Sequence, residues 1–320
     1  MTRRGPPSKV APMARDGKTA ERGQPRRYVL AGQAVETPPL PAGLYLVATP
    51  IGNLRDIGLR ALETLAGADV IACEDSRVTR KLTGHYGITT PLTLYHEHNA
   101  AAARPKLLAR IAAGEAVALV SDAGTPLISD PGYRLAREAV DAGFAVIPVP
   151  GASALLSALT AAGLPTDRFF FEGFLPPKQS ARQKRIARLA TIPATLVLFE
   201  SGPRLAAALA DLAAGLGARA AAVCRELTKL HEEIRRDDLA SLARHYESGG
   251  ETRGEIVIVV APPAEHVETA EDVDALLRRA LLRVSVKDAV GEVALATGRP
   301  RREVYRRALE LEKDGEDGAA

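Results

Sequence analysis

The sequence predicts an α/β fold: two α/β domains followed by a helical unit. Three observations support this prediction. Short apolar runs alternate with helix-like segments from Gly43 onward, a second series of such runs begins at Phe169, and the pattern after Pro263 is purely helical. Alternation of strands and helices is typical of a largely parallel sheet covered by helices. At 320 residues, the chain is long enough for two domains of ordinary size.

The segment before the first expected strand, residues 1–42, has a different composition from the rest. It carries eight Lys or Arg against three acidic residues, is rich in Pro and Gly, and shows no hydrophobic periodicity. Segments of this kind bury too little apolar surface to fold. We therefore expect residues 1–42 to form a disordered basic extension.

The first α/β domain is expected over residues 43–165. Its strands are predicted at the apolar runs 44–48, 70–73, 92–95, 117–120 and 145–149, with helical patterns at 59–65 and 107–113. Ligands of open α/β sheets bind outside the carboxyl ends of the strands. The residues that follow each strand therefore indicate where a site would lie.

Each of these five strands is followed by a polar or Gly/Pro-rich loop. The loops read TPIGN, EDSR, HEHN, SDAGTPLISDPG and PGASA. The fourth, residues 121–132, is the most informative, because Ser121, Asp122 and Thr125 follow a buried strand directly and a second pair, Ser129 and Asp130, lies further along. Such a loop offers several hydrogen bonds to a small polar molecule. The sequence predicts a ligand site at this edge.

The second α/β domain is expected over residues 166–265, after a hinge at 163–168. Its strands are predicted at 169–171, 195–199, 220–224 and 255–260. The segment RELTKLHEE, residues 225–233, directly follows the third of these strands and concentrates polar groups there. We expect this segment to contribute to a site as well.

The last unit, residues 268–320, is expected to be helical. Helices are predicted at 273–282, 285–297 and 301–311, with a turn at 298–300. Two helices around a short Gly-containing turn, the second beginning with two arginines, resemble a helix-turn-helix. A helical hairpin that caps the core would give the same pattern.

Charge and motif content narrow the function further. Residues 168–188 hold six basic side chains against one acidic, and residues 275–307 hold nine against three. Such clusters suit a polyanionic partner, and solvated helix faces would give them too. The P-loop and GxSxG motifs are absent, the first strand lacks a GxGxxG, and the spacing of His96 and His98 does not suit a metal site on one helix face, so no metal is expected.

The cellular setting is predicted from what the sequence lacks. Only Cys73 and Cys224 are present, each in an apolar run, which indicates reduced, buried thiols. No apolar run approaches the roughly 18 residues that a membrane span needs, and the first residues do not resemble a secretory signal. We expect a cytoplasmic protein without a membrane partner.

Eight segments, in order, resemble the tetrapyrrole methylase superfamily, and more narrowly its branch of small-subunit (16S) ribosomal RNA cytidine 2′-O-ribose methyltransferases. They are GLYLVATPIGNLRDI, ACEDSR, YHEHN, LVSDAGTPLISDPG, VPGASA, FEGFLP, LFESGPR and CRELTKLHEE. The resemblance spans residues 43–260, and the C-terminal unit resembles that family's helix-turn-helix appendage. Residues 1–42 find no counterpart.

The resemblance implies two α/β domains of the tetrapyrrole methylase type with a cofactor cleft between them, usually in a homodimer. The implied cofactor is S-adenosyl-L-methionine, and the implied partner is 16S ribosomal RNA within the small ribosomal subunit. Residues matched to cofactor contacts are Ile51, Asp122, Thr125, Ser153, Ala154, Phe199, Glu200 and Leu227. Ser121, Asp122 and Ala123 stand where porphyrin-modifying relatives carry GDP-type sequences, which argues against a porphyrin-like substrate.

A ribose hydroxyl is a weak nucleophile, so a base or a cation beside it would help its methylation. Candidates for this role, unranked, are Asp75, His96, Glu97, Lys229 and Glu232. RNA contacts are expected from Arg77, Lys178, Arg182, Lys184, Arg185, Arg188, Arg301 and Arg302. The alternatives are a tetrapyrrole methylase with the same fold and cofactor, and a non-enzymatic ribosome-assembly protein that binds RNA.

Overall fold

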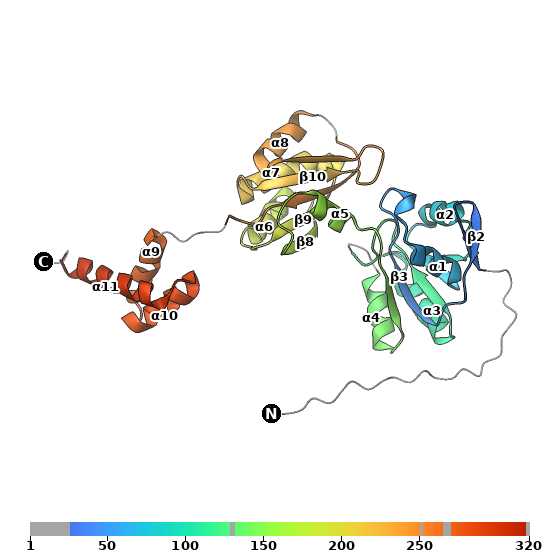
Figure 1. Ribbon diagram of the computed structural model, residues 1–320, viewed down its shortest axis with the longest axis horizontal. Coiled ribbons are helices and arrows are strands. Elements are labelled where there is room, and N and C mark those ends of the chain that lie inside the picture. The colour runs from blue at the N-terminus through green and yellow to red at the C-terminus, as the bar shows by residue number, and fades with distance from the viewer. Residues whose placement is uncertain (1–25, 129–131, 250–251, 265–269, 318–320) are drawn as a thin grey trace, which may run out of the picture.

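The computed structural model describes residues 26–128, 132–249, 252–264 and 270–317 (Figure 1). The predicted α/β fold is confirmed: two sheets with their helices are followed by a group of three helices. The Ser129 and Asp130 pair and the first 25 residues of the expected extension lie outside the described residues.

A β-hairpin precedes the first domain, so the prediction of disorder over residues 1–42 is wrong for residues 27–36. Strands β1 (Arg27–Leu30) and β2 (Gln33–Glu36) pair antiparallel around a turn in which Ala31 and Gly32 have positive φ angles of 50° and 80°. Tyr28 is 3% exposed and packs into the core of the first domain. Burial of this aromatic ring offsets the conformational entropy that the hairpin loses when it folds. Two polar contacts also fasten the segment, from the backbone N–H of Val29 to the carbonyl of Tyr86 and from Arg26 to Asp69.

The first domain is built on a five-stranded sheet whose strands are all parallel, as predicted. The strands are β3 (Gly43–Val47), β4 (Val70–Cys73), β5 (Leu92–Leu94), β6 (Ala116–Leu119) and β7 (Val146–Val149), arranged in the order β5-β4-β6-β3-β7. Each begins within one residue of its predicted position. The carboxyl ends of all five therefore meet at one edge.

Helices cover both faces of this sheet. Helices α1 (Leu59–Gly67) and α2 (Ser76–His85) pack with the hairpin on one face, and α3 (Ala100–Ala112) and α4 (Tyr133–Asp141) pack on the other. The strand residues alternate between the two cores: Leu44 and Val117 face α3 and α4, while Tyr45 and Ala118 face α1. A short 3₁₀ turn, η1 (Leu54–Asp56), precedes α1.

The second domain has a mixed five-stranded sheet. Its strands are β8 (Phe169–Phe174), β9 (Thr195–Ser201), β10 (Ala220–Arg225), β11 (Glu233–Asp238) and β12 (Glu255–Val260), in the order β11-β10-β12-β9-β8. Only β8 and β9 pair parallel. Strand β11 was not predicted, because its sequence EIRRDD is polar and lies at the sheet edge with no core of its own to mark it.

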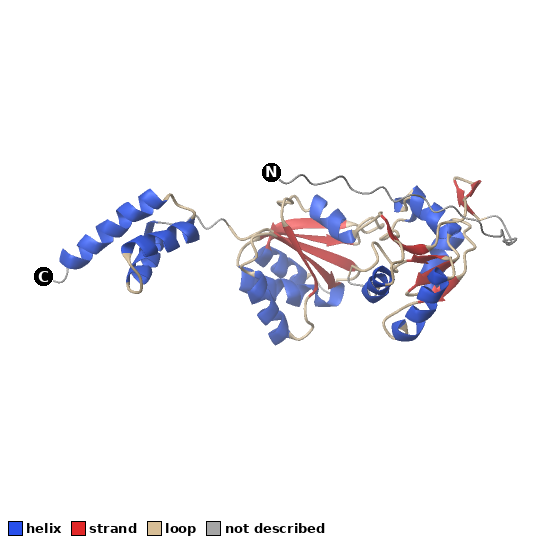
Figure 2. Ribbon diagram, turned by 90° about the horizontal axis from the view of Figure 1, so that it is seen from below, coloured by secondary structure: helices blue, strands red, loops and turns tan. Residues whose placement is uncertain are grey.

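One face of this second sheet is covered by helices α6 (Gln179–Leu189), α7 (Leu205–Leu216) and α8 (Leu239–Ser248), with the 3₁₀ turn η2 (Gly202–Arg204) before α7. Figure 2, turned from the first view, shows the strands of both sheets against their helices. The opposite face carries Val197, Ala222 and Val257 and turns partly toward the first domain.

Helix α5 (Ala154–Ala161) follows the last strand of the first sheet, yet it packs on the second one. Its Leu155, Ala158 and Leu159 share an apolar cluster with Val197 and Val257 of the second sheet. The predicted boundary at residues 165–166 placed this helix in the first domain. By its packing, the change of domain lies before α5, close to residues 150–153.

The C-terminal unit consists of α9 (Ala270–Leu281), α10 (Val286–Thr297) and α11 (Arg301–Asp317). An apolar cluster drawn from these three helices, including Leu277, Val293 and Val304, forms its core. Gly298 ends α10 in the left-handed conformation, with φ of 65°, at the predicted turn. Among the residues that the structure describes, no helix has the length and apolarity to cross a bilayer.

Candidate active site

The loops at the carboxyl edge of the first sheet are tied to one another. The 121–128 loop pairs with the loop after β3, because the N–H of Thr49 donates to the carbonyl of Gly124 at 2.9 Å and the N–H of Gly124 donates back at 3.0 Å. Gly124 has φ of +77°, a conformation that favours glycine, and a Cβ there would lie 3.2 Å from the Ile51 side chain. These contacts fix both loops in one arrangement.

The polar side chains of the 121–128 loop form hydrogen bonds within the loop and to the neighbouring loops. The hydroxyl of Ser121 donates within the loop to the carbonyls of Ala123 and Gly124, so it is a structural group. Asp122 accepts from the backbone N–H of Asp75 at 3.0 Å, which joins the loop to the end of β4. Thr125 donates to the carbonyl of Ala152 at 3.3 Å and thereby fixes the segment that leads into α5.

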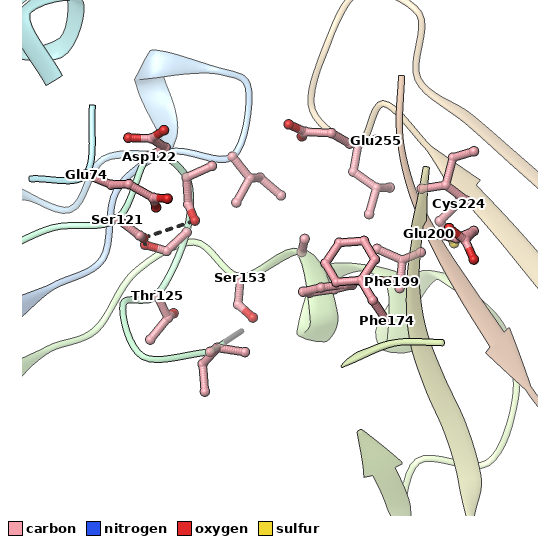
Figure 3. Close-up of a pocket in the computed structure, with 18 residues that line it drawn as sticks. Glu74, Ser121, Asp122, Thr125, Ser153, Phe174, Phe199, Glu200, Cys224 and Glu255 are labelled. Atoms are coloured by element: carbon pink, nitrogen blue, oxygen red, sulfur yellow. Dashed lines mark hydrogen bonds between the residues drawn. The ribbon is translucent and has the colours of Figure 1, made fainter. Parts of the chain in front are cut away.

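A cavity of about 370 Å³ lies between these loops and the second sheet (Figure 3). All eight residues that the sequence matched to cofactor contacts line it: Ile51, Asp122, Thr125, Ser153, Ala154, Phe199, Glu200 and Leu227. The first sheet's loops and the N-terminus of α5 form one wall, and β9, β12 and the end of β10 form the other. We call this cavity the donor pocket.

The donor pocket is acidic. Carboxylates of Glu74, Asp122 and Glu255 border it, whereas none of the described residues that line it is Lys, Arg or His. A concave site with one sign of charge concentrates ligands of the opposite sign. The pocket therefore suits a molecule with cationic groups.

The wall of the donor pocket on the second domain is apolar and aromatic. The ring of Phe199 packs edge-to-face against Phe171 and Phe174, with centroids 4.9 and 5.7 Å apart. Beside them lies Cys224, where burial raises the pKa of the thiol to about 11. The thiol stays protonated near neutral pH and contributes a small apolar surface.

Glu200 lines the donor pocket through its backbone. Side chains alternate along β9, so that Val197 and Phe199 face the donor pocket side while Leu198 and Glu200 face α7. Figure 3 shows the Glu200 carboxylate directed away from the cavity. It pairs instead with Arg204 at 3.2 Å on the far face of the sheet. The carboxylate is thus separated from any ligand in the pocket.

The segment after β10, which the sequence singled out, folds over the mouth of the donor pocket. Glu226 and Thr228 have positive φ angles of 51° and 66°, so the loop is tightly turned. Thr228 accepts from the backbone N–H of Asn53 at 3.2 Å, a contact that joins the second domain to the first. A Cβ at Gly52 would lie 2.4 Å from Cγ of Lys229, so only glycine allows the two loops to meet this closely.

Lys229 is the cation at this mouth. Its Nζ lies 2.8 Å from Glu226 Oε1 and 3.0 Å from Glu255 Oε2. Burial lowers the pKa of Lys229, but hydrogen bonds to the two carboxylates outweigh it and the pKa is raised. The raised pKa favours the charged ammonium form, which suits the stabilisation of a developing negative charge better than a role as general base.

The other predicted catalytic residues lie further from the donor pocket or are already engaged. Asp75 caps α2 and binds the guanidinium of Arg77, which holds its pKa at about 2, so it is a poor base. Glu232 accepts from the N–H of Thr228 at 2.6 Å and supports the loop. His96 lies in a separate shallow hollow with Asp75 and Arg77, and Glu97 is exposed beside it.

The basic residues predicted to bind RNA differ in availability. Arg182 is 5% exposed and binds the carboxylate of Asp211, so its assignment to RNA binding is corrected: it is part of the interior of the second domain. Arg185 pairs with Glu172 and Arg77 with Asp75. Exposed residues are Lys178, Lys184 and Arg188 around α6 and Arg301 and Arg302 at the start of α11.

Comparison with family models identifies both parts of the chain. Residues 43–243 match the model described as Tetrapyrrole (Corrin/Porphyrin) Methylases, which is more than half of the chain. The chain belongs to this family. Residues 267–312 match a second model, the RsmI C-terminal HTH domain, so the interpretation of the last helices as a helix-turn-helix unit is confirmed.

Curated relatives narrow the position within the family. A protein of Mesorhizobium japonicum is 52% identical over 88% of this chain and 96% of its own length, and one of Erythrobacter litoralis is 52% identical over 85% and 96%. One of Escherichia coli O157:H7 is 44% identical over 83% and 94%. All three are named ribosomal RNA small subunit methyltransferase I. The chain is thus a methyltransferase, dependent on S-adenosylmethionine.

Solved structures support the fold of this methyltransferase. Cobalt precorrin-4 methyltransferase aligns with 68% of this chain and 94% of its own, at 18% identity and a TM-score of 0.52. Diphthine synthase aligns with 68% and 89%, at 19% identity and a TM-score of 0.54. At this level of identity the likeness concerns the fold alone.

Several residues of the donor pocket were not predicted. Phe174, Cys224 and Glu255 lie on three strands of the second sheet that converge only in the folded domain. The signal available in the sequence was that Cys224 and Glu255 sit at strand ends beside the predicted sites. The antiparallel pairing of β10 and β12, which brings those ends together, is invisible in the periodicity of either strand.

Proposed function

We propose that this methyltransferase transfers a methyl group to the 2′-hydroxyl of a cytidine ribose in 16S ribosomal RNA within the small ribosomal subunit. The names of its curated relatives and the C-terminal domain that it shares with them support an rRNA substrate. The observation that carries the proposal is that the acidic donor pocket lies next to the charged Lys229. The pocket suits a cationic methyl donor, and the lysine suits the negative charge that develops on an acceptor oxygen.

The residues of the donor pocket fit S-adenosylmethionine chemically. Bound there, this molecule would supply a methyl group on a sulfonium, an electrophile that needs no metal to react. The carboxylates of Asp122 and Glu74 suit its ammonium and sulfonium charges, and the N-terminus of α5 at Ser153 suits its carboxylate. The Phe199 wall suits the adenine ring. We assign donor binding to these groups.

Lys229 is the residue that we place nearest the acceptor hydroxyl. Its ammonium group, held by Glu226 and Glu255, would stabilise negative charge on the ribose oxygen as this oxygen takes the methyl group from the sulfur and its proton passes to solvent. The contact between Thr228 and Asn53 holds this loop against the first domain, which orients Lys229.

The deciding experiment is transfer of labelled methyl groups to small ribosomal subunits from a strain that lacks this modification, followed by nucleoside analysis. We expect label in 2′-O-methylcytidine. Lys229→Met should lower the single-turnover rate by about 100-fold or more while donor binding, measured by calorimetry, stays within twofold. Lys106→Met, at an exposed lysine on α3 away from the pocket, serves as the matched control.

Other outcomes would favour the alternatives. Labelling of a porphyrinoid in place of RNA would indicate a tetrapyrrole methylase, and RNA binding without transfer would indicate an assembly factor. The names of the curated relatives and the shared C-terminal domain argue against the first alternative, and the donor pocket argues against the second. We also propose that the protein acts as a homodimer in the cytoplasm; the exposed Phe169 on edge strand β8 offers an apolar contact for association. Sedimentation at micromolar concentration tests the dimer.

A further inference from the structure

Two further hollows adjoin the donor pocket, one smaller and one more open than it. The first, which we call the α2 hollow, encloses about 210 Å³ and shares Ile51, Asp122 and Glu255 with the donor pocket. The second, the histidine hollow, is shallower and shares Glu74 and Asp122 with it. Each shares lining residues with a different side of the donor pocket, so we compare the two as sites for the substrate that receives the methyl group.

The α2 hollow lies between the two domains. Its wall on the first domain is one side of α2, with Val78, Thr79 and Lys81, together with Leu54 of η1. The opposite wall includes Lys229. Tyr86, which follows α2, donates a hydrogen bond from its hydroxyl to the carbonyl of Leu54 at 2.7 Å, and this contact fixes η1 against the helix. The hollow therefore leads from an exposed helix face to the ammonium group assigned to the acceptor oxygen.

The charges of the two hollows differ. The α2 hollow holds two carboxylates, those of Asp122 and Glu255, and the second of these is paired with Lys229. Lys81 also lines this hollow and is exposed without an ion pair in the described part of the chain, and Arg55, next to Leu54, is likewise exposed without one. The histidine hollow holds three carboxylates, those of Glu74, Asp75 and Asp122, and its one arginine is bound to Asp75. A phosphodiester backbone is repelled by the second arrangement and attracted by the first.

From these contacts we infer that the α2 hollow is the subsite for the acceptor nucleotide, with Lys81 and Arg55 binding the phosphates that flank it. The inference rests on the proposed function and specifies where its RNA substrate lies. It differs from the sequence-based prediction, which placed RNA contacts on α6, on α11 and at Arg77. Those surfaces would bind more distant parts of the RNA.

A charge reversal tests the phosphate contacts. In Arg55→Glu/Lys81→Glu, the KM for small subunits should rise on the order of tenfold at low salt, and the slope of log affinity against log salt should fall by about 1 for each lost contact. Donor affinity should be unchanged. Lys106→Glu is the matched control, because this exposed lysine lies on α3, which packs on the other face of the first sheet.

A steric test separates the two hollows. Val78 is 37% exposed in the α2 hollow, and Leu94 is 44% exposed in the histidine hollow, so tryptophan at either position extends into its hollow from the surface without disturbing a core. Val78→Trp should reduce methyl transfer at least tenfold with donor binding intact. Leu94→Trp should leave transfer within twofold of the wild type.

The opposite pattern, with Leu94→Trp inactive and Val78→Trp active, would overturn the inference and assign the nucleotide to the histidine hollow. The inference would also be overturned if Val78→Trp, Leu94→Trp and Arg55→Glu/Lys81→Glu all transferred methyl groups at the wild-type rate. Failure of the proposed function is a distinct result, since the wild-type protein itself would then label no ribosomal RNA. Circular dichroism melts of each variant show whether a loss of activity reflects unfolding.

Discussion

Arg182 and Asp211 form an ion pair inside the second domain, with both side chains 6% exposed. Burial alone would raise the pKa of Asp211, but hydrogen bonds from Gln183, Arg182 and Gln179 outweigh it and lower the pKa. Such a group is charged in the folded state and stabilises it above the ordinary carboxyl pKa of about 4. The stabilisation is lost as the pH falls below that value.

Removal of one partner should therefore be strongly destabilising. Arg182→Met leaves a buried carboxylate without its main partner, and we expect the free energy of unfolding at pH 7 to fall by about 3 to 5 kcal/mol. The double variant Arg182→Met/Asp211→Leu should recover most of this loss, because no charge is left buried. Denaturant titrations at pH 7 and pH 3 measure both effects.

The control for this prediction is Lys184→Met on the exposed side of the same helix, which should change the unfolding free energy by less than about 0.5 kcal/mol. The deficit of Arg182→Met relative to the wild type should shrink at pH 3, where Asp211 becomes protonated in the variant. Equal stability of the single variant and the wild type at pH 7 would contradict the structural role of the pair.

Gly52 offers a second test at the scale of a residue. A Cβ at this position would lie 2.4 Å from Cγ of Lys229 and 3.0 Å from Oγ1 of Thr228, so Gly52→Ala must displace the loop that carries the ammonium group. A misplacement of about 1 Å can lower a catalysed rate on the order of 100-fold. We expect kcat to fall between about 10- and 100-fold, with donor binding little changed.

Gly84→Ala is the matched control for Gly52→Ala, since nothing lies within 4 Å of a Cβ at that position in α2. It should leave kcat unchanged and raise stability by about 0.5 kcal/mol, because alanine is the better helix former. Unchanged kcat in Gly52→Ala as well would show that the position of Lys229 is not critical to the rate.

The sequence predicted which residues line the donor pocket better than it predicted where their side chains point. The five matched residues of the first domain line the donor pocket because loops at the carboxyl ends of parallel strands lie at one edge, and the three from the mixed second sheet were placed by the family resemblance alone. The carboxylate of Glu200 nevertheless points to the opposite face, since it follows Phe199 by one residue in a strand. Likewise, a count of basic residues could not show that Arg182 has a buried partner 29 positions away.

At the scale of elements, strands of the first sheet were predictable because each is a short apolar run bounded by polar loops. Two features were not predicted, strand β11 and the packing of α5 on the second sheet, and both depend on tertiary contacts. Strand β11 is polar and pairs only through its backbone with β10, and α5 continues from the first sheet but finds its apolar partners on the second. Neither choice is visible in local periodicity.

The β1–β2 hairpin is an element whose contribution can be measured. Tyr28 packs into the core of the first domain at 3% exposure, although its segment reads as a polar extension. Truncation of a buried aromatic side chain to alanine commonly costs about 3 to 5 kcal/mol. We expect Tyr28→Ala to destabilise the first domain toward the low end of that range, and a protein that begins at residue 43 to lose at least as much.

Tyr28→Phe separates packing from polarity in this experiment. It keeps the ring in place, and we expect it to remain within about 1 kcal/mol of the wild type in a thermal melt. If the protein that begins at residue 43 melted at the wild-type temperature, the hairpin would contribute nothing measurable to the stability of the first domain.

At the scale of the molecule, function is divided among three packed units. The donor pocket draws residues from both α/β domains, so a ligand that binds it should stabilise them jointly, whereas the C-terminal helices have an apolar core of their own. Arg307 and Asp274 pair across α11 and α9, and this contact lowers the pKa of Asp274 and raises that of Arg307. The third unit thus has its own core and its own polar fastening.

This division predicts the effect of removing the third unit. A protein that ends at residue 264 should bind S-adenosylmethionine as the full chain does, because every described residue of the donor pocket precedes that point. It should bind small subunits more weakly, with a smaller salt dependence, because the exposed Arg301 and Arg302 are lost. We expect kcat to change less than KM.

Calorimetry for the donor and filter binding between 50 and 200 mM salt measure the two affinities. The control is Arg301→Gln/Arg302→Gln in the full chain, which removes the two charges and leaves the C-terminal helices in place. A truncated protein with unaltered affinity for small subunits and an unaltered salt slope would show that the C-terminal helices have a role other than RNA binding.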